Sequence, residues 1–426
     1  MAANDEKRVV YMNANSTTLM PNEVVKKMIQ WVNRGNPSDD HASALEARKL
    51  MDSFREHIAK LCGFALADYA VIFTSGASES NNFMVTSAVR SYAHATGTLP
   101  HIVTSAVEHK SLLECCRLLE TERLAELTVV PVATAGPALG AVRPEDVQKA
   151  IRRNTCIVSV MAANNETGVL NDVGEIAAIA RAKGVPFHTD AVQAFAKAPL
   201  QLAKTPVDAF SVSFHKLHGP PGVGLLVVSR KLIDGYHLCP HICGTQNGGL
   251  RGGTEPIHSI AAAFEAVLYT MRDRRRKNER LAKLRAAIRA IVAKSLPAFD
   301  LDDYESGSAA AVWEKGGRPV VVWLAPKDPA LTLPNTLLLA VYRPGFCNRA
   351  ARAALEARGV IVSVGSACNA ASAAPSGVVA AMAVPKELQD GVLRVSLLDD
   401  ATPEDVKKFV VAFVGVVTST DCLRAA

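Results

Sequence analysis

The segment Ser211-Val-Ser-Phe-His-Lys-Leu-His-Gly-Pro-Pro-Gly-Val-Gly224 places one lysine between an apolar run and a cluster of glycines and prolines. Residues 207–214 alternate and are rich in β-branched and aromatic side chains, which predicts a strand. Lys216 then lies at the end of a strand, where open α/β sheets bind their ligands. A lysine there, flanked by Ser213 and His215, suits covalent capture of an aldehyde as a Schiff base. A single strand-end lysine is more often an ordinary residue, so this interpretation depends on the rest of the chain.

The composition is typical of a soluble globular protein. Of the 426 residues, 49% are apolar and 21% are charged, which argues against a disordered chain. The length predicts two or three domains. The net charge of +6 is spread along the sequence, and the densest basic run, residues 272–280, indicates a solvated helix face. We therefore expect no nucleic-acid binding.

The sequence carries no sign of export or of a membrane span. The first eight residues lack the apolar segment of a signal peptide, and the apolar residues 409–417 are too few to cross a bilayer. The nine cysteines contain no C-x-x-C pair and no zinc-like spacing, which is typical of reduced thiols. We expect a cytoplasmic protein that uses no metal and binds no membrane.

The order of apolar runs predicts an α/β fold with two domains. Seven strand-like runs between residues 69 and 228 alternate with helical stretches, which predicts a mostly parallel sheet between helices. Residues 260–295 predict one long charged helix. Strands at 319–323 and 336–341 and a helix at 349–358 predict a smaller α+β domain, with loops at 306–311 and 314–318. We assign residues 20–265 to the large domain, and 1–19 and 266–426 to the small one.

Two further segments have the chemistry of a site for a phosphorylated ring. In Val71-Ile-Phe-Thr-Ser-Gly-Ala-Ser-Glu-Ser-Asn-Asn82, a glycine turn opens a helix whose free N–H groups and Ser78 hydroxyl suit a phosphate, although Ser78 could equally be a helix cap. Asp190 ends the strand of Val185-Pro-Phe-His-Thr-Asp-Ala-Val-Gln193. A carboxylate there can keep a pyridine nitrogen protonated, and Gln193 can donate to an oxygen on the ring.

Three other positions could complete such a site. His109 follows the strand at 101–104 and could stack on the ring and transfer a proton. Asn164-Asn-Glu-Thr-Gly168 offers amides to a cofactor or a substrate carboxylate. Arg394, in a β-like run of the second domain, suits a substrate α-carboxylate.

Together these motifs resemble the NifS-like cysteine desulfurases, group V of the fold type I pyridoxal phosphate enzymes. The resemblance extends from residue 13 to about residue 404 and includes T-S-G-A-S-E-S-N-N, N-N-E-T-G, D-A-V-Q, S-F-H-K and R-G-G-T. It implies a homodimer with shared sites, and a set of residues in contact with pyridoxal 5'-phosphate. These are Ala77, Ser78, His109, Asn165, Asp190, Gln193, Ser213, His215 and Lys216, with Thr254 reaching the phosphate of the neighbouring subunit.

The segment Val364-Gly-Ser-Ala-Cys-Asn-Ala-Ala-Ser372 bears on the activity. Small residues around Cys368 predict an uncrowded loop in which a thiolate can approach a substrate. The segment is similar to the G-S-A-C persulfide loop of the family, which implies that Cys368 takes sulfur from L-cysteine, leaves L-alanine, and passes the sulfur to an acceptor protein for iron–sulfur clusters or thiolation. Lys216, Cys368, His109 and Asp190 are the expected catalytic residues, and Asn165 and Arg394 the expected substrate ligands.

Two alternatives stay open at this point. A selenocysteine or cysteine lyase would release selenide or sulfide without needing Cys368. A cofactor-binding subunit without activity would produce no alanine, and altered positions such as Cys243, Thr245 and Gly252, which differ from the family pattern, are compatible with it. We favour the enzyme, because a decayed site would lose Lys216, Asp190 or Cys368 early.

Overall fold

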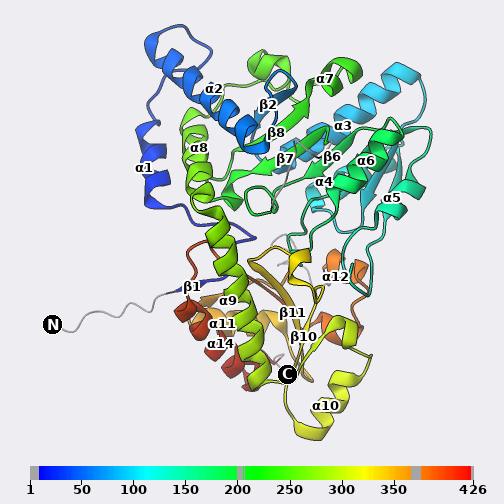
Figure 1. Ribbon diagram of the computed structural model, residues 1–426, viewed down its shortest axis with the longest axis vertical. Coiled ribbons are helices and arrows are strands. Elements are labelled where there is room, and N and C mark those ends of the chain that lie inside the picture. Colours follow the sequence, from blue (N-terminus) through cyan, green and yellow to red (C-terminus); the bar gives the residue numbers. More distant parts are fainter. Residues whose placement is uncertain (1–8, 199–204, 206, 366–375, 424–426) are drawn as a thin grey trace, which may run out of the picture.

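The structure, a computed structural model, describes residues 9–198, 205, 207–365 and 376–423. Figure 1 shows two layered regions, one above the other in this view, with helix α9 running alongside the lower one. Each region is built on its own β-sheet.

The upper region contains a seven-stranded sheet. Six of its strands run parallel, and β8 is antiparallel to both of its neighbours, β2 and β7. The mostly parallel sheet expected from the sequence is therefore confirmed. The strands, in their order across the sheet, are β2 (Tyr69–Thr74), β8 (Gly224–Ser229), β7 (Ala209–Ser213), β6 (Phe187–Asp190), β5 (Thr155–Ser159), β3 (His101–Ser105) and β4 (Glu126–Val130).

Helices cover both faces of this sheet because successive side chains of a strand point to opposite faces. In β2, Val71 and Phe73 pack into one apolar cluster, whereas Ile72 packs into another. The first face is covered by α2 (Ala42–Cys62), α5 (Pro144–Ala150), α6 (Val173–Ala182) and α8 (Ile257–Met271), with α1 (Asn22–Gln30) against α8. The second is covered by α3 (Ala77–Thr96), α4 (Lys110–Thr121) and α7 (Arg230–Tyr236).

The lower region contains a four-stranded sheet of order β13 (Val392–Ser396), β11 (Thr336–Tyr342), β10 (Val320–Trp323) and β9 (Ala298–Asp300). A separate parallel pair joins β1 (Val10–Tyr11) to β12 (Val360–Ile361). Val321 and Trp323 face α9 (Arg274–Ser295), α11 (Asn348–Ala357) and α14 (Pro403–Thr418). Val320 and Val322 face the other way and join the main core of the upper sheet. The two regions therefore share one apolar core.

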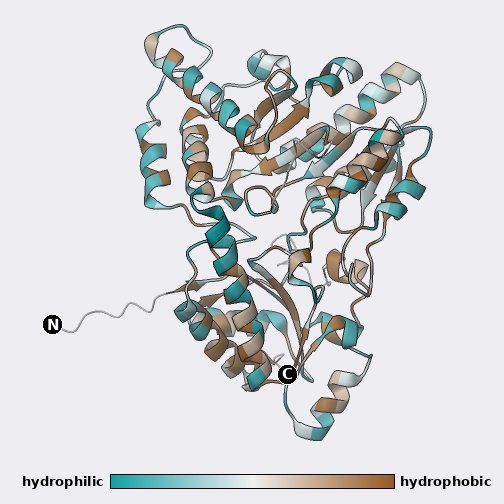
Figure 2. Cartoon of the chain, in the orientation of Figure 1, coloured by the Kyte–Doolittle hydropathy of each residue, from teal (hydrophilic) through white to brown (hydrophobic). Residues whose placement is uncertain are grey.

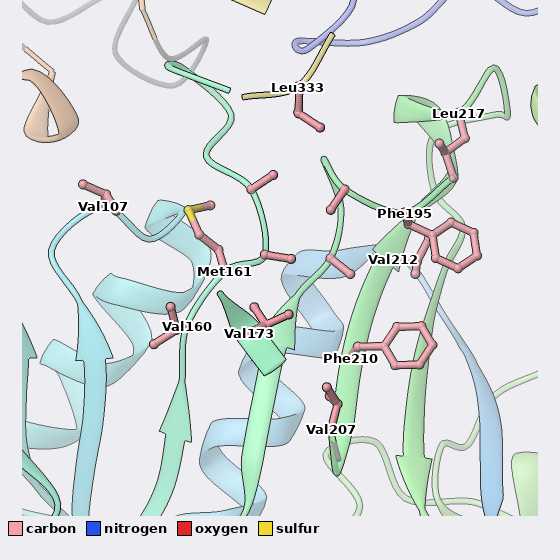
Figure 3. Close-up of a cluster of buried hydrophobic side chains, with 14 of the residues drawn as sticks. Val107, Val160, Met161, Val173, Phe195, Val207, Phe210, Val212, Leu217 and Leu333 are labelled. Carbon is pink, nitrogen blue, oxygen red and sulfur yellow. The ribbon is translucent and has the colours of Figure 1, made fainter. Parts of the chain in front are cut away.

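Part of that core lies at and just beyond the carboxyl ends of the strands. Figure 3 shows Met161 just after β5, Phe195 after β6 and Leu217 after β7, with Leu333 of the lower region opposite them. All four side chains are buried. Close-packed apolar side chains leave little conformational freedom to the polar residues beside them.

Two of the sequence predictions about local structure are wrong. Residues 260–295 form two helices, α8 and α9, because Arg272 leaves helical geometry and Asp273 adopts a left-handed φ of 54°. The break occurs where the chain passes from the upper sheet to the lower one. Figure 2 shows hydrophilic residues in the turns of α9 that follow it.

The segment expected to form loops at 306–311 and 314–318 contains α10 (Ser308–Gly316). Its start is held by Glu387 of α13 (Lys386–Gln389), whose Oε1 accepts hydrogen bonds from Ser306 Oγ and from the Gly307 amide. Ala309 is fully buried. These contacts come from residues about 80 positions away and leave no local sequence signal. The assigned domain boundary at 265/266 stays a prediction.

Candidate active site

A cavity of about 370 Å³ opens at the carboxyl ends of the parallel strands. Its volume lies within the range of small-molecule sites, and its position is where sheets of this kind bind ligands. Segments that follow β2, β3, β5, β6 and β7 all contribute to it. The lining residues are Asn15, Ser16, Ser75, Gly76, Ala77, Ser78, His109, Ser111, Met161, Asn165, Asp190, Val192, Gln193, Ser213, His215, Lys216, Pro221, Gly222 and Arg394.

Lys216 enters the cavity from a single 3-10 turn, Phe214–Lys216, directly after β7. Its Nζ donates to the carbonyl oxygen of Asn15 at 2.9 Å and also to that of Ser16. Neutral carbonyls therefore hold the amine in the cavity. Gly224, which follows, is needed for close packing, since a Cβ there would lie 2.6 Å from Gly76 Cα.

Asp190 is the last residue of β6 and is only 4% exposed. Its Oδ2 accepts a hydrogen bond from Asn81 Nδ2 at 2.8 Å, and its Oδ1 accepts one from the Val192 amide at 3.0 Å. Both donors are uncharged and fix the direction of the carboxylate. A buried carboxylate that lines a cavity is best matched by a cationic N–H group, and a protonated pyridine nitrogen provides one.

The first turn of α3 forms an anion cradle at one end of the cavity. Gly76, Ala77 and Ser78 all line it, and the first N–H groups of a helix have no acceptor within that helix. Glu79, in the same turn, is paired with Arg251 at 2.9 Å, so its charge is balanced. This arrangement fits a phosphate group.

His109 caps α4, and its Nδ1 accepts a hydrogen bond from the Ser111 amide at 3.1 Å. Burial lowers its pKa, Asp190 partly opposes this, and Lys216 lowers it further. A neutral ring with Nδ1 as acceptor carries its proton on Nε2. Asn81 links this group to Asp190, because its Nδ2 also donates to Ser111 Oγ at 3.2 Å.

Arg394, in β13, brings a guanidinium group to the opposite wall of the cavity although its side chain is almost completely buried. Its two terminal nitrogens donate to the Asn165 carbonyl at 3.0 Å and to Asn13 Oδ1 at 2.9 Å. Its Nε has no partner among the described residues. Burial lowers its pKa to about 10, and Glu166 opposes this shift. The group is still charged at neutral pH, and its unpartnered N–H suits a carboxylate.

The two asparagines of the N-N-E-T-G motif have different roles. Asn164 is buried, and its Oδ1 accepts from the amides of Glu166 and Thr167 at 2.9 Å each. It shapes the turn rather than the cavity. Asn165, in contrast, lines the cavity.

Ser213 and His215 also line the cavity. Burial lowers the pKa of His215 to about 4, with Lys216 adding to the effect, so this ring is neutral. Thr254 is exposed and is not among the lining residues of this single chain. Cys368 lies outside the described residues.

The described chain before Cys368 ends at residue 365, and its last residues lie beside Arg394. Ser363 and Arg394 exchange backbone hydrogen bonds of 3.1 and 2.7 Å. Two residues later, a Cβ at Gly365 would lie 3.2 Å from Oε2 of the buried Glu166.

Sequence reasoning assigned no role to three residues that connect these groups. Asn81 and Ser111 join Asp190 to His109. Asn15 accepts from Lys216 through its carbonyl and donates through Nδ2 to Thr336 Oγ1 at 2.8 Å. Asn81 stands one turn after Ser78, which is a weak signal. For Asn15 the only signal is its position within the family resemblance, which begins at residue 13.

Within the described residues, no group of three or more histidine, cysteine, aspartate or glutamate side chains is placed to hold a metal ion. None of the helices in this part of the chain combines the length and hydrophobicity of a membrane span.

Comparison with known proteins places these features in a family. Residues 10–298 match the family described as "Aminotransferase class-V". The chain is 35% identical to "Cysteine desulfurase IscS" of Dictyoglomus turgidum, over 94% of this chain and 92% of that protein. It is also 33% identical to "Selenocysteine lyase" of Bos taurus, over 94% and 91%. The solved structure of a "NIFS-LIKE PROTEIN" superposes with a TM-score of 0.78 at 28% identity, covering 96% of this chain and 99% of that one.

Proposed function

The chain belongs to the class-V aminotransferase family and is a pyridoxal phosphate-dependent enzyme of the cysteine desulfurase type, and on this premise we propose that it converts L-cysteine to L-alanine with Cys368 as the sulfur acceptor. The observation that carries the proposal is the sharing of one cavity by Lys216, Asp190 and Arg394. An amine for an aldehyde, a carboxylate for a ring nitrogen and a guanidinium for an amino-acid carboxylate are the three anchors that this reaction needs.

Bound pyridoxal phosphate supplies an aldehyde for covalent attachment and a ring that withdraws electrons from the substrate Cα. Lys216 is proposed to hold the aldehyde and Asp190 the ring nitrogen. The turn at Gly76–Ser78 is proposed to hold the phosphate, and Gln193, Ser213, His215 and Asn165 to surround the ring. His109 is proposed to stack on it. The donors and acceptors described above match these groups in charge and type.

The substrate is proposed to bind through its α-carboxylate to Arg394 and Asn165. Arg394 already uses two nitrogens to hold Asn165 and Asn13, so its orientation is fixed before the substrate binds. Such preorganisation reduces the entropy lost on binding. The unpartnered Nε supports this role.

Two side chains that line the cavity, Lys216 and His109, are proposed for proton transfer. When it is not attached to the cofactor, the amine of Lys216 would lie in the cavity, where it is proposed to take the substrate Cα proton. His109, whose pKa is lowered by burial, is proposed to donate a proton beside it from Nε2, which carries the proton of the neutral ring. Proton transfer by a positioned acid or base typically raises the rate of such a reaction about 10²- to 10⁴-fold.

The sulfur step is proposed to involve attack of the Cys368 thiolate on the substrate sulfur. An S–S bond forms, the Cβ–S bond breaks, and its electron pair stays on Cβ, which is then protonated to give alanine. The sum is cysteine plus enzyme thiol to alanine plus enzyme persulfide, which balances without an added oxidant or reductant. The pairing of Ser363 with Arg394 supports the proposal, because it starts the Cys368 segment beside the substrate carboxylate site.

The test is mass spectrometry after treatment with L-cysteine. We expect one added sulfur on the peptide that contains Cys368, and none in Cys368→Ser. The variant should still bind pyridoxal phosphate, since no described cavity residue is changed, while alanine formation stops because a hydroxyl group is a far weaker nucleophile than a thiolate. The exposed Cys243 offers a matched control, and Cys243→Ser should keep full activity.

A selenocysteine lyase is the second candidate, supported by the 33% identity to the bovine protein of that name. Alanine formation at a normal rate by Cys368→Ser would favour this lyase chemistry. No alanine from the wild type with either cysteine or selenocysteine would instead favour a cofactor-binding subunit without activity.

We also propose a cytoplasmic homodimer, in which Thr254 reaches the phosphate of the neighbouring subunit. Its exposure in the single chain leaves it accessible for this contact. An acceptor protein for the sulfur, in iron–sulfur cluster assembly or in thiolation, is proposed as a partner. Sedimentation of the wild type and of Thr254→Ala tests the dimer, and cofactor affinity tests the contact.

A further inference from the structure

One buried lysine is left unused by the mechanism above. Lys197 is 7% exposed and lies in the turn that follows β6. Lysine is rarely buried without a close ionic partner. Its Nζ donates a hydrogen bond to Gln193 Oε1 at 3.3 Å, and Gln193 lines the cavity. The ammonium group of Lys197, which does not line the cavity, therefore contacts Gln193, a proposed ligand of the cofactor.

The local backbone produces this contact. The amides of Phe195 and Ala198 donate to the carbonyls four residues earlier, Ala191 and Ala194, but Ala196 adopts a left-handed φ of 59°, so the segment is a compact turn rather than a helix. This turn folds the chain back so that Lys197 Nζ reaches Gln193 Oε1. The turn is anchored from outside, because Asn278 Nδ2 donates to the Lys197 carbonyl at 2.7 Å.

The ammonium group of Lys197 favours one orientation of the Gln193 side-chain amide. An ammonium group can only donate hydrogen bonds, so the amide oxygen must face Lys197. The NH₂ group then faces the other side, where Nε2 donates to the Asn15 carbonyl at 3.0 Å. Its second N–H remains available to a ligand oxygen. Without Lys197, only the Asn15 carbonyl, among the described residues, would favour this orientation of the amide.

The charges around Lys197 keep it cationic at neutral pH. Burial lowers its pKa to about 8, Asp399 after β13 opposes this shift, and Arg274 of α9 adds to it. On the cavity side, the positive charge of Lys197 lowers the pKa of His215, to which Lys216 also contributes. The field of Lys197 therefore extends into the site.

We propose that Lys197 is a positioning residue for the cofactor: it holds the Gln193 amide with its NH₂ group toward the ring oxygen of pyridoxal phosphate and places a positive charge behind that oxygen. This inference rests on cofactor binding as proposed above, and it names no new step in the reaction. Both effects favour the anionic ring oxygen. They lower the pH at which the bound chromophore loses its proton.

The test is a pH titration of the visible absorption of the loaded enzyme. Lys197→Met removes the charge and the hydrogen bond with little change in length. We expect the midpoint to rise by about one pH unit and the affinity for pyridoxal phosphate to fall. Lys197→Arg should restore most of the shift, because it keeps a cationic donor. Lys283→Met, at an exposed lysine on α9, is the matched control and should leave the midpoint unchanged.

A double-mutant cycle separates positioning from charge alone. In Gln193→Leu, which has no amide to orient, Lys197→Met should move the midpoint by clearly less than in the wild type. An equal shift in both backgrounds overturns the role of Gln193, and no shift in the wild-type background overturns the whole inference. If Lys197→Met does not fold, Lys197→Gln compared with Lys197→Arg gives the same test. A wild type without a visible band would contradict cofactor binding itself, which is a different outcome.

Discussion

The two walls of the cavity are built in different ways. The sheet wall consists of residues at strand ends of the seven-stranded sheet, namely Ser78, His109, Asp190, Gln193 and Lys216. The opposite wall, here the junction wall, consists of Asn15, Asn165 and Arg394, which come from distant parts of the chain. Hydrogen bonds such as Arg394–Asn13, across 381 positions, hold it together. The sheet wall is thus set by the strands themselves, whereas the junction wall exists only when both sheets have come together.

This difference matters because the two walls would hold different things. The residues of the sheet wall are held by close packing, since buried apolar side chains such as Phe195 and Leu217 lie beside them, and such a wall suits a permanently bound cofactor. The junction wall carries the arginine proposed for the substrate. Changes in the sheet wall should therefore affect the cofactor, and changes in the junction wall should affect the substrate.

Replacement of Lys216, a residue of the sheet wall, should have the largest effect on activity. Lys216→Ala should lose the visible absorption of the attached cofactor and reduce turnover by about 10²- to 10⁴-fold, because the proposed attachment point and base are both removed. Borohydride reduction of the wild type followed by peptide mapping locates the label. A label on any other lysine contradicts the assignment, and Lys231→Ala, at an exposed lysine, should behave as wild type.

Loss of Asp190 should come next. Asp190→Ala should keep the fold but lower turnover on the order of 10²-fold or more, since the ring nitrogen would no longer be held protonated. Cofactor affinity, measured by dialysis, should fall with it. Near-normal alanine production would exclude the proposed role. Asp234→Ala removes an exposed carboxylate and serves as the control.

Arg394→Lys tests the junction wall. We expect the KM for cysteine to rise about 10- to 100-fold, because lysine is a point charge that cannot reproduce the guanidinium fork. The cofactor spectrum should stay normal, since the sheet wall is intact. A variant with weaker cofactor binding but an unchanged KM for cysteine would contradict the distinction between the two walls.

Asp399 lies outside both walls, and its replacement should give the smallest effect. It lies after β13, and it pairs with Arg274 of α9 at 2.8 Å and with His218 at 3.6 Å. Although burial alone would raise its pKa, hydrogen bonds and charges from His218 and Arg274 hold it well below its usual value. Asp399→Asn should lower the Tm at neutral pH by a few °C.

The pH dependence of this difference has a definite sign. A carboxyl whose pKa is lower in the folded state stabilises the fold above its unfolded pKa of about 3.9. That contribution is lost as the pH falls below this value toward the folded pKa. The gap in Tm between wild type and Asp399→Asn should therefore be widest near neutral pH and shrink below about pH 4. A gap that does not depend on pH would mean that the charge of Asp399 has no part in it.

Local sequence patterns account for most of the sheet wall. Strand periodicity followed by a glycine turn or a polar residue is such a pattern, and parallel strands bring their carboxyl ends to one edge. Lys216, Asp190, His109 and Ser78 are therefore assigned to one site by sequence alone. The α/β class with its mostly parallel sheet follows from the same periodicity.

The junction wall and the residues that orient the site depend instead on tertiary packing. Asn81 and Lys197 make their contacts through side chains, and Asn15 contacts Lys216 through its carbonyl. The sequence around a polar residue carries no signal of which distant group it will contact. The break between α8 and α9 has the same origin, because Arg272 leaves the helix where the chain passes from one sheet to the other. Hydrogen bonds between residues hundreds of positions apart depend on how the two sheets pack together, which local propensity does not encode.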